Sequence, residues 1–302
     1  MPSHELELLD WLMRRVSAHP ALRLGMGDDM AVIDTGRERI LLASDMLLDG
    51  VHFDSGTQPL DKIGRKAVAC NLSDCAAMAV KPIAVTVSIA LHREMSASQA
   101  QAIFAGIFGI LREYHVALAG GDTTSWPHPL ALDVSILAMP FEGIEPVSRK
   151  GARIGDLVYV TGPLGGSILG RHLDFQPRIK EARALAERLG ERLHAMMDIS
   201  DGLSLDFWRL CQASRIGGLL DENLIQRVVS ADAHSLAKSD GVSPIQHALA
   251  DGEDFELLLA VDGDVSSSPV PLFPVGEITE AGFAWRRTDG RVETLTPTGY
   301  LH

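Results

Sequence analysis

The sequence predicts an α+β fold divided into two domains. Apolar and polar residues alternate over 83–91 and 130–136, as in strands buried on one face, and single stretches of helical periodicity separate such strands. This mixture favours α+β over a wound parallel sheet, in which strands and helices would alternate regularly. The 302 residues also exceed a typical single domain. We place the boundary in the proline-containing stretch 140–146, which gives domains over 1–145 and 146–302.

Composition argues against several classes of partner. The net charge of −13 repels nucleic acid and anionic membrane surfaces, and only 5% of the residues are aromatic. The three cysteines, Cys70, Cys75 and Cys211, lack metal-ligand spacing, so we expect reduced, mostly buried thiols. The acidic start differs from a signal peptide, and the apolar run over 78–91 is too short to span a bilayer. We therefore expect a cytoplasmic protein without nucleic-acid or membrane partners.

Periodicity and caps predict the elements of the N-terminal domain. Leu6, Leu9, Met13 and Val16 recur at helical spacing, and Ser96 is a residue type that caps helices. The expected elements are, in order, a helix over 6–16, strands over 31–33 and 40–43, a loop over 46–58, a helix over 60–79, a strand over 83–91, a helix over 96–114, and strands over 116–119 and 130–136.

The C-terminal domain is also expected to contain both strands and helices. The expected strands cover 157–161, 196–199, 257–261, 275–278 and 292–295, and the expected helices begin after Ser167 and cover 203–213 and 231–238. Asp201 lies between a strand and a helix, so it is either a metal ligand or an N-cap.

Acids recur at the edges of apolar segments. The run Leu118-Ala-Gly-Gly-Asp-Thr-Thr124 breaks at two glycines and then presents Asp122 and two hydroxyls. Glycine lets backbone approach a ligand closely, and carboxylate oxygens are ligands that Mg²⁺ prefers. A hairpin turn is the alternative for this run, and a solvated helix face is the alternative for Asn71, Ser73 and Asp74. We predict that the acids converge on Mg²⁺ and phosphate.

Three further segments carry candidate ligands with open alternatives. His52 is either a ligand or a solvated loop histidine. The stretch from Arg149 to Asp156 is either a phosphate site or a solvated hairpin. In the acidic segment before the strand over 257–261, Glu253 and Asp254 are the pair that we expect to face inward.

Established nucleotide motifs are absent from the sequence. It contains no Walker loop and no protein-kinase motif, and the Gly-x-Gly at 25–27 lacks the third glycine of a dinucleotide fingerprint. Nucleotide binding would therefore depend on acids bridged by metal ions.

Taken together, these motifs resemble those of the thiamine-monophosphate kinase family, in the superfamily that includes aminoimidazole ribonucleotide synthase and selenophosphate synthetase. The resemblance covers nearly the whole chain. The matching segments are Gly27-Asp28-Asp29, Ser44-Asp45 with His52, Asn71-Leu-Ser-Asp-Cys-Ala-Ala-Met78, Gly120-Gly-Asp-Thr-Thr124, Arg149 with Gly155-Asp156, Asp198-Ile-Ser-Asp-Gly-Leu203 and Gly252-Glu-Asp-Phe-Glu-Leu257.

The resemblance implies ATP-dependent phosphorylation of thiamine monophosphate to thiamine diphosphate by direct in-line transfer assisted by several Mg²⁺ ions. It also implies a homodimer in which the N-terminal ATP-binding and Mg²⁺-binding domain pairs its sheet with a second subunit as a barrel-like core. By matching positions, the implied metal ligands are Asp29, Ser44, Asp45, Asp74, Asp122, Asp198 and Asp201. The implied ATP contacts are Phe104, Gly121, Asp122, Arg149 and Ser200, and the implied thiamine monophosphate contacts are His52, Glu253 and Tyr300.

The acceptor is itself a phosphate whose second pKa is near ~6, so its attacking oxygen is mostly deprotonated at neutral pH and no general base is required. The chain departs from the family pattern at Ala43, where a hydroxyl residue is common, and at Asp251, which replaces a glycine. The segment between Gly170 and Met196 is also short for the family.

Two alternative functions remain open. One is a related synthetase that makes aminoimidazole ribonucleotide or selenophosphate, and the other is a non-catalytic metal-binding dimer. A selenophosphate synthetase would carry a reactive cysteine near its glycine loop, whereas the first cysteine here is Cys70. A hydrogenase-maturation relative would end in cysteine, and this sequence ends in Leu301-His302.

Overall fold

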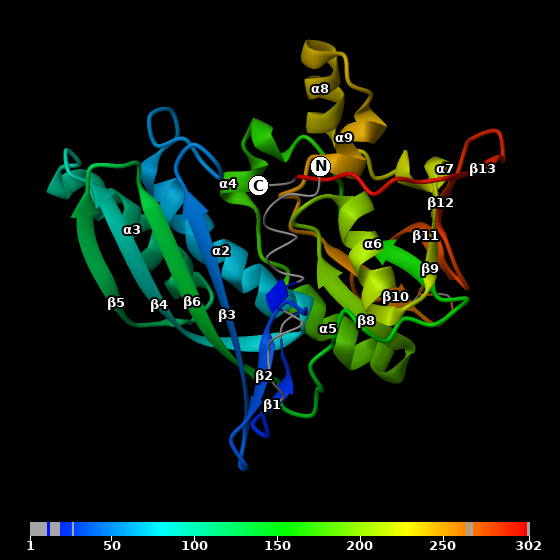
Figure 1. Ribbon diagram of the computed structural model, residues 1–302, viewed down its shortest axis with the longest axis horizontal. Helices are drawn as coiled ribbons and strands as arrows, with labels where there is room; N and C mark the ends of the chain where they lie inside the picture. The colour runs from blue at the N-terminus through cyan, green and yellow to red at the C-terminus, as the bar shows by residue number, and fades with distance from the viewer. Residues whose placement is uncertain (1–10, 13–18, 26, 264, 266–267, 301–302) are drawn as a thin grey trace.

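The computed structural model describes residues 11–12, 19–25, 27–263, 265 and 268–300, and most of the helix expected over 6–16 lies outside them. Two mixed β-sheets lie side by side with helices between and around them (Figure 1). No helix in the described part of the chain is both long enough and apolar enough to cross a membrane.

The first sheet is built from the N-terminal half of the chain, in the order β1-β2-β3-β6-β4-β5. Helices α2 (Leu60–Ala77) and α3 (Ala97–Glu113) belong to the same half. The strands are β1 (Leu22–Leu24), β2 (Ala31–Asp34), β3 (Arg39–Leu48), β4 (Val80–His92), β5 (Ala117–Trp126) and β6 (Ala131–Pro140). The order leaves β1 and β5 as edges, so the described strands form an open sheet and not a closed barrel.

The alternation of apolar and polar residues along its strands explains why one face of this sheet is buried. In β4, Val85, Val87 and Ile89 are buried, whereas Thr86 and Ser88 are exposed, as the sequence predicts for a strand buried on one face. The predicted N-cap of α3 is confirmed, because Ser96 forms a capping box with Gln99.

The second sheet has the order β13-β12-β9-β11-β7-β10-β8, and only the β12–β9 pair is parallel. Its strands are β7 (Leu157–Val160), β8 (Leu193–Asp198), β9 (Gly217–Asp221), β10 (Leu257–Val261), β11 (Phe273–Thr279), β12 (Phe283–Arg286) and β13 (Val292–Thr294). The helices of this half are η1 (Ser167–Leu169), α4 (Arg171–Asp174), α5 (Ile179–Leu189), η2 (Gly190–Arg192), α6 (Leu203–Ser214), α7 (Glu222–Ile225), α8 (Ala231–Asp240) and α9 (Pro244–Ala250).

The cores of the two halves meet at α2. Leu257 and Leu259 of β10 pack in one hydrophobic cluster with α2, α3 and the first sheet, whereas Leu258 and Ala260 pack in a second cluster with α6. The second sheet therefore buries both faces, one of them against the N-terminal half. Helix α2 is consequently surrounded by protein and can present side chains between the two halves.

Several predicted boundaries are wrong. Strand β3 runs to Leu48, so Asp45 lies within a strand and not at its end. Strand β5 runs to Trp126, so the Gly-Gly-Asp run is neither a hairpin turn nor a loop beyond a strand. Gly121 is required there because a Cβ would lie 1.8 Å from the carbonyl oxygen of Val87.

The C-terminal half also departs from expectation. The single helix expected after Ser167 is replaced by the short η1 and α4, and the longer α5 follows. The three cysteines are free, with Cys75 and Cys211 buried and Cys70 partly buried, as expected of mostly buried thiols.

Candidate active site

Three carboxylates from distant parts of the chain meet between the two halves. One oxygen from each of Asp29, Asp74 and Asp198 lies within 4.8 Å of the others. Asp29 precedes β2, Asp74 lies on α2, and Asp198 ends β8. The fold therefore confirms that acids from three of the predicted motifs converge.

These acids and the neighbouring Asp45 ionise at a higher pH than usual. Burial, reinforced by neighbouring carboxylates, raises the pKa to about 7 for Asp29, to about 6 for Asp45 and Asp198, and well above the usual range for Asp74. A bound cation would reverse this effect because it stabilises the ionised forms. Such an arrangement is unfavourable without a ligand and favourable with one.

The environment of Asp74 is buried and not solvated. Asn71 and Ser73 are 0% and 1% exposed, so the solvated-face alternative is wrong for this part of α2. The hydroxyl of Ser73 donates a hydrogen bond to Asp198. Helix α2 is thus joined directly to the end of β8 beside the carboxylate cluster.

Arg149 is held at the cluster by two acids. Its Nη2 donates to Asp29 Oδ1 at 2.5 Å, and its backbone nitrogen donates to Asp28, which also accepts from the Ser148 hydroxyl at 2.5 Å. The Arg149 side chain is only 18% exposed, so the solvated-hairpin alternative is wrong for it. Asp29 Oδ2 and Arg149 Nε are buried and have no hydrogen-bond partner among the described residues. Asp29 Oδ2 is thus left for a ligand, whereas Arg149 Nε lies 3.8 Å from Asp28 Oδ1.

Asp201 does not cap the helix that follows it. The N-cap of α6 is Gly202, and it is Asp206 that accepts hydrogen bonds from the backbone nitrogens of Asp201 and Gly202. The Asp201 carboxylate instead pairs with Arg209, which also binds Asp206 at 3.0 Å. The N-cap interpretation of Asp201 is therefore wrong.

A cavity that is lined in part by the cluster shares a wall with a second, larger cavity. A cavity of 170 Å³ is lined by Asp45, Asp74, Asp198, Ser200 and Asp201 among others, and a neighbouring cavity has a volume of 500 Å³. The residues that line both cavities are His52, Glu253 and Tyr300. The three residues implied to bind thiamine monophosphate are therefore brought together.

The larger cavity suits a cationic ring system. Val51, Phe53, Ile168 and Leu236 contribute apolar surface, and the acids are Asp54, Asp251 and Glu253. The hydroxyl of Tyr300 donates to the carbonyl of Val51 at 3.3 Å, and Lys66 donates to Glu253 at 2.6 Å. Apolar walls with acidic groups at a few points favour a flat organic cation.

Asp254 also faces inward, as predicted, but its hydrogen bonds are made to other residues of the protein. It is 2% exposed and accepts hydrogen bonds from the Gly165 nitrogen at 2.9 Å and from Arg171 at 2.7 Å. Asp254 thereby fixes the loop that leads into η1 at the larger cavity.

Some residues implied for ATP or Mg²⁺ lie elsewhere in the chain. Asp122 is exposed on the edge strand β5, where it accepts from the Thr123 nitrogen, and Gly121 precedes it. Phe104 lies on α3 with its ring 6.1 Å from that of Phe108. Neither Phe104 nor the Gly-Asp pair lines the cavities at the cluster.

Ser44 lies beside the cluster. It lines a cavity of 330 Å³ together with all three acids of the cluster and Arg149. Its hydroxyl, however, is hydrogen-bonded to Asp133 at 3.2 Å and to Ser135 at 3.0 Å on β6.

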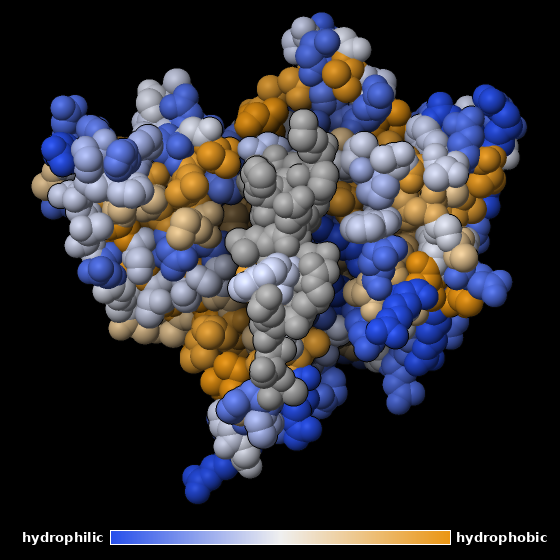
Figure 2. Space-filling view, in the orientation of Figure 1, coloured by the Kyte–Doolittle hydropathy of each residue, from blue (hydrophilic) through white to orange (hydrophobic). Residues whose placement is uncertain are grey.

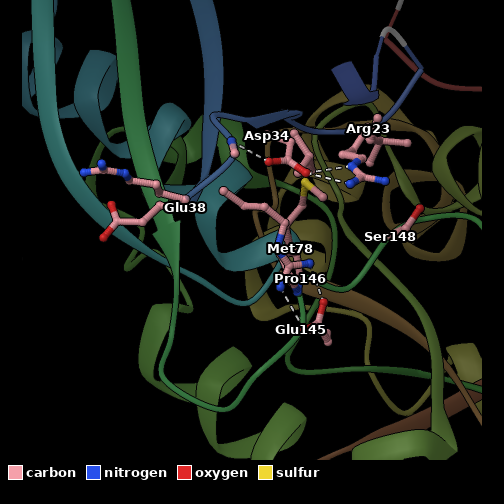
Figure 3. Close-up of a pocket in the computed structure, with 12 residues that line it drawn as sticks. Arg23, Asp34, Glu38, Met78, Glu145, Pro146 and Ser148 are labelled. Carbon is pink, nitrogen blue, oxygen red and sulfur yellow. Dashed lines mark hydrogen bonds and ion pairs between the residues drawn. The ribbon is translucent and has the colours of Figure 1, made fainter. Parts of the chain in front are cut away.

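A separate cavity of 680 Å³ lies beside β1, β2 and residues 145–148 (Figure 3). Four of its charged groups pair with one another, Arg23 with Asp34 at 2.7 Å and Arg39 with Glu145 at 2.5 Å. It offers no counterpart to the carboxylate cluster.

Sequence reasoning missed two residues at the site. Lys66 precedes Asp74 by eight residues on α2, a spacing that places both on one helical face and could have identified it. Asp28 was included in a motif, but its role in orienting Arg149 depends on a contact 121 residues away in sequence.

Comparisons with known proteins agree with this geometry. The family model for the AIR synthase related protein N-terminal domain matches residues 27–139. The thiamine-monophosphate kinase of Rhodopirellula baltica is 38% identical, over 99% of this chain and 97% of its own length. That of Escherichia coli K12 is 30% identical, over 100% and 99% of the two chains.

Solved structures have a similar fold. AaThiL complexed with AMPPCP and TMP is 25% identical with a TM-score of 0.84, over 98% of this chain and 96% of that chain. The Escherichia coli hydrogenase maturation protein HypE, at 18% identity and a TM-score of 0.72 over 97% and 96% of the chains, shares the fold. On the identities over the full length of its relatives, the chain belongs to the thiamine-monophosphate kinase family.

Proposed function

We propose that this protein is an ATP-dependent kinase that phosphorylates thiamine monophosphate to thiamine diphosphate. The observation that carries the proposal is the common wall between the carboxylate-lined cavity and the apolar, acid-rimmed cavity. A molecule with a phosphate at one end and a cationic ring system at the other would occupy both. The complex of AaThiL with AMPPCP and TMP supports the choice of nucleotide and acceptor.

We infer that the carboxylates hold Mg²⁺. The donor set is all oxygen, and Asp29 Oδ2 is buried without a partner in the described chain, as expected of a ligand atom. The residues that would hold the ions are Asp29, Asp45, Asp74, Asp198 and Asp201, with Ser44 beside the cluster. When bound, Mg²⁺ supplies positive charge that neutralises the phosphate oxygens during transfer.

The protein's own groups position the reactants. Arg149, anchored by Asp28 and Asp29, would bind the ATP phosphates, with Ser200 nearby in the same cavity. The acceptor phosphate is already mostly ionised at neutral pH, so no residue needs to remove a proton. Rate enhancement would come from holding the donor and acceptor phosphates in line and from charge neutralisation.

The acceptor would be oriented by the shared wall. Tyr300 offers a ring face and Glu253 an opposite charge to the cationic thiamine rings. His52 lines the same wall, and its Nδ1 accepts from the Leu48 nitrogen at 3.0 Å, which fixes the ring orientation. These contacts would place the acceptor phosphate in the smaller cavity.

A homodimer would complete the site. Leu42, Met46, Leu118 and Trp126 of the first sheet are large apolar residues that are 37–59% exposed. Figure 2 shows hydrophobic residues on the first-sheet side of the molecule, above the tip of the turn between β2 and β3. A second copy that pairs with this sheet would form a barrel-like core.

That second copy would also explain the residues that lie away from the cluster. Asp122, Gly121 and Phe104 would contact ATP and Mg²⁺ across the dimer interface. The domains would divide at 145/146, between the end of β6 at Pro140 and the start of β7 at Leu157.

Phosphorus NMR of the purified protein with ATP, Mg²⁺ and thiamine monophosphate tests the proposal. We expect thiamine diphosphate and ADP in equal amounts, and none without Mg²⁺. A related synthetase would leave thiamine monophosphate unchanged, and a non-catalytic dimer would leave ATP intact. Either result would reject the kinase assignment.

A further inference from the structure

Lys66 is a buried cation that the carboxylate cluster does not account for. It lies on α2, is 0% exposed, and donates from Nζ to Glu253 Oε1 at 2.6 Å and to the His52 carbonyl at 2.5 Å. Burying an ammonium is unfavourable unless it is paired and hydrogen-bonded. Both partners of Lys66 belong to the shared wall of the two cavities, whereas Lys66 itself is not among the lining residues of either.

The Lys66 contact restrains a strained segment of the second half. Glu253 and Phe255 have φ values of 52° and 50°, which non-glycine residues rarely adopt. The Glu253 nitrogen donates to the Ser200 carbonyl at 2.6 Å, and the Phe255 ring stacks on Phe175 at 3.9 Å. Such conformations persist only where the surroundings hold them. Lys66 contributes a hydrogen bond to Glu253 from the opposite half of the molecule.

The charge of Lys66 affects which ligands can bind at the shared wall of the two cavities. Glu253 shares the smaller cavity with the carboxylates of Asp45, Asp74, Asp198 and Asp201. An unpaired Glu253 would add to the repulsion of an acceptor phosphate. Lys66 pairs with Glu253 through Oε1, so that Oε2 is left to contact the organic end of the acceptor.

We propose that Lys66 is a positioning residue for the acceptor: it fixes the Glu253 carboxylate and the His52 backbone, and thereby sets the affinity for thiamine monophosphate but not for ATP. The inference rests on the proposed function. It differs from a purely structural role, in which loss of Lys66 would lower stability without distinguishing the two substrates.

Steady-state kinetics of Lys66→Met test this role against Lys62→Met. Lys62 lies one turn earlier on α2, is 41% exposed, and pairs with Asp174 at 2.5 Å outside the site. We expect Lys66→Met to raise KM for thiamine monophosphate about 10-fold or more, as for a lost charge-assisted hydrogen bond. KM for ATP should stay within about twofold, and Lys62→Met should change neither constant.

A double variant separates positioning from folding. If Lys66 acts through Glu253, adding Lys66→Met to Glu253→Gln should change KM for thiamine monophosphate by less than about twofold. The double variant has a neutral pair, so it remains measurable where Lys66→Met alone fails to fold.

Three outcomes would overturn the inference: an unchanged KM for thiamine monophosphate in Lys66→Met, an equal rise in KM for ATP, or the full effect of Lys66→Met in the Glu253→Gln background. A wild-type protein that forms no thiamine diphosphate would instead reject the proposed function.

Discussion

Single carboxylates define the chemistry of the site. Asp29, Asp74 and Asp198 come from segments that share no local structure, and each is harder to ionise because burial raises its pKa and neighbouring carboxylates add to this effect. The residue types and their order along the chain could be predicted from the sequence. Which oxygen lies free, as Asp29 Oδ2 does, depends on the Arg149 contact 120 residues away and could not.

Replacing Asp74 by Asn should separate activity from stability. We expect phosphoryl transfer to fall at least about 100-fold, the upper end of what even outer-shell losses cost at metal sites. The metal-free protein should become more stable, because burial and the neighbouring carboxylates disfavour the ionised form of Asp74, whereas the amide of Asn is always neutral. Urea unfolding in EDTA measures this change. The control is Asp289→Asn at an exposed ion pair, and a less stable Asp74→Asn would contradict the like-charge account.

Stability without divalent cations should depend on pH in a defined direction. The folded-state pKa values of Asp29, at about 7, and of Asp45 and Asp198, at about 6, exceed the ordinary value of 3.8, so the folded state binds more protons. Their contribution is fully present below about pH 4 and is lost as the pH rises through 6 to 7. Thermal unfolding in EDTA from pH 5 to pH 8 should show this decline, and Mg²⁺ should offset it. An equally steep decline in Asp74→Asn would argue against the cluster as its source.

At the scale of elements, helix α2 organises the site, because it carries Lys66, Ser73 and Asp74 between the two halves. Its range and the alternation of β4 follow from local periodicity and could be predicted. The extension of β5 through two glycines could not, since it depends on how closely Gly121 approaches Val87 on the neighbouring strand. The short α7 and α9 were missed because tertiary packing outweighs propensity over so few residues.

The position of α2 depends on its close contact with α3. A Cβ at Gly106 would lie 1.7 Å from the Asp61 carbonyl oxygen, whereas one at Gly109 meets nothing within 4 Å. Gly106→Ala should therefore lower the free energy of unfolding by about 1–3 kcal/mol through overpacking. Gly109→Ala on the same helix should raise it by up to about 1 kcal/mol through helix propensity. Equal effects of the two substitutions in urea unfolding would show that the helices can separate freely.

At the scale of the molecule, the two-domain α+β fold was predicted correctly, whereas the barrel-like dimer core remains a proposal. The first sheet alone is open, and its exposed apolar residues indicate where a second copy would pack. Composition and periodicity could not reveal this surface. Apolar and polar residues alternate similarly along a strand whether its outer face is exposed to solvent or covered by a second subunit.

Met46→Asp tests the dimer. Met46 on β3 and Val292 on β13 are both 59% exposed, so Val292→Asp is a matched control on the other sheet. Analytical ultracentrifugation should give twice the chain mass of 32.6 kDa for the wild type and the control. Met46→Asp should be monomeric; because Met46 also lines the smaller cavity, the test of the dimer is the measured mass and not a loss of activity. A fully active monomer would contradict the shared site.

The most direct test of the carboxylate centre is an anomalous diffraction map from crystals grown with Mn²⁺ in place of Mg²⁺ and a non-hydrolysable ATP analogue. The account predicts a Mn²⁺ peak coordinated by oxygens of Asp29, Asp74 and Asp198 and bridged to the nucleotide phosphates. Nucleotide bound with no Mn²⁺ at these three carboxylates, or Mn²⁺ bound only elsewhere, would contradict it.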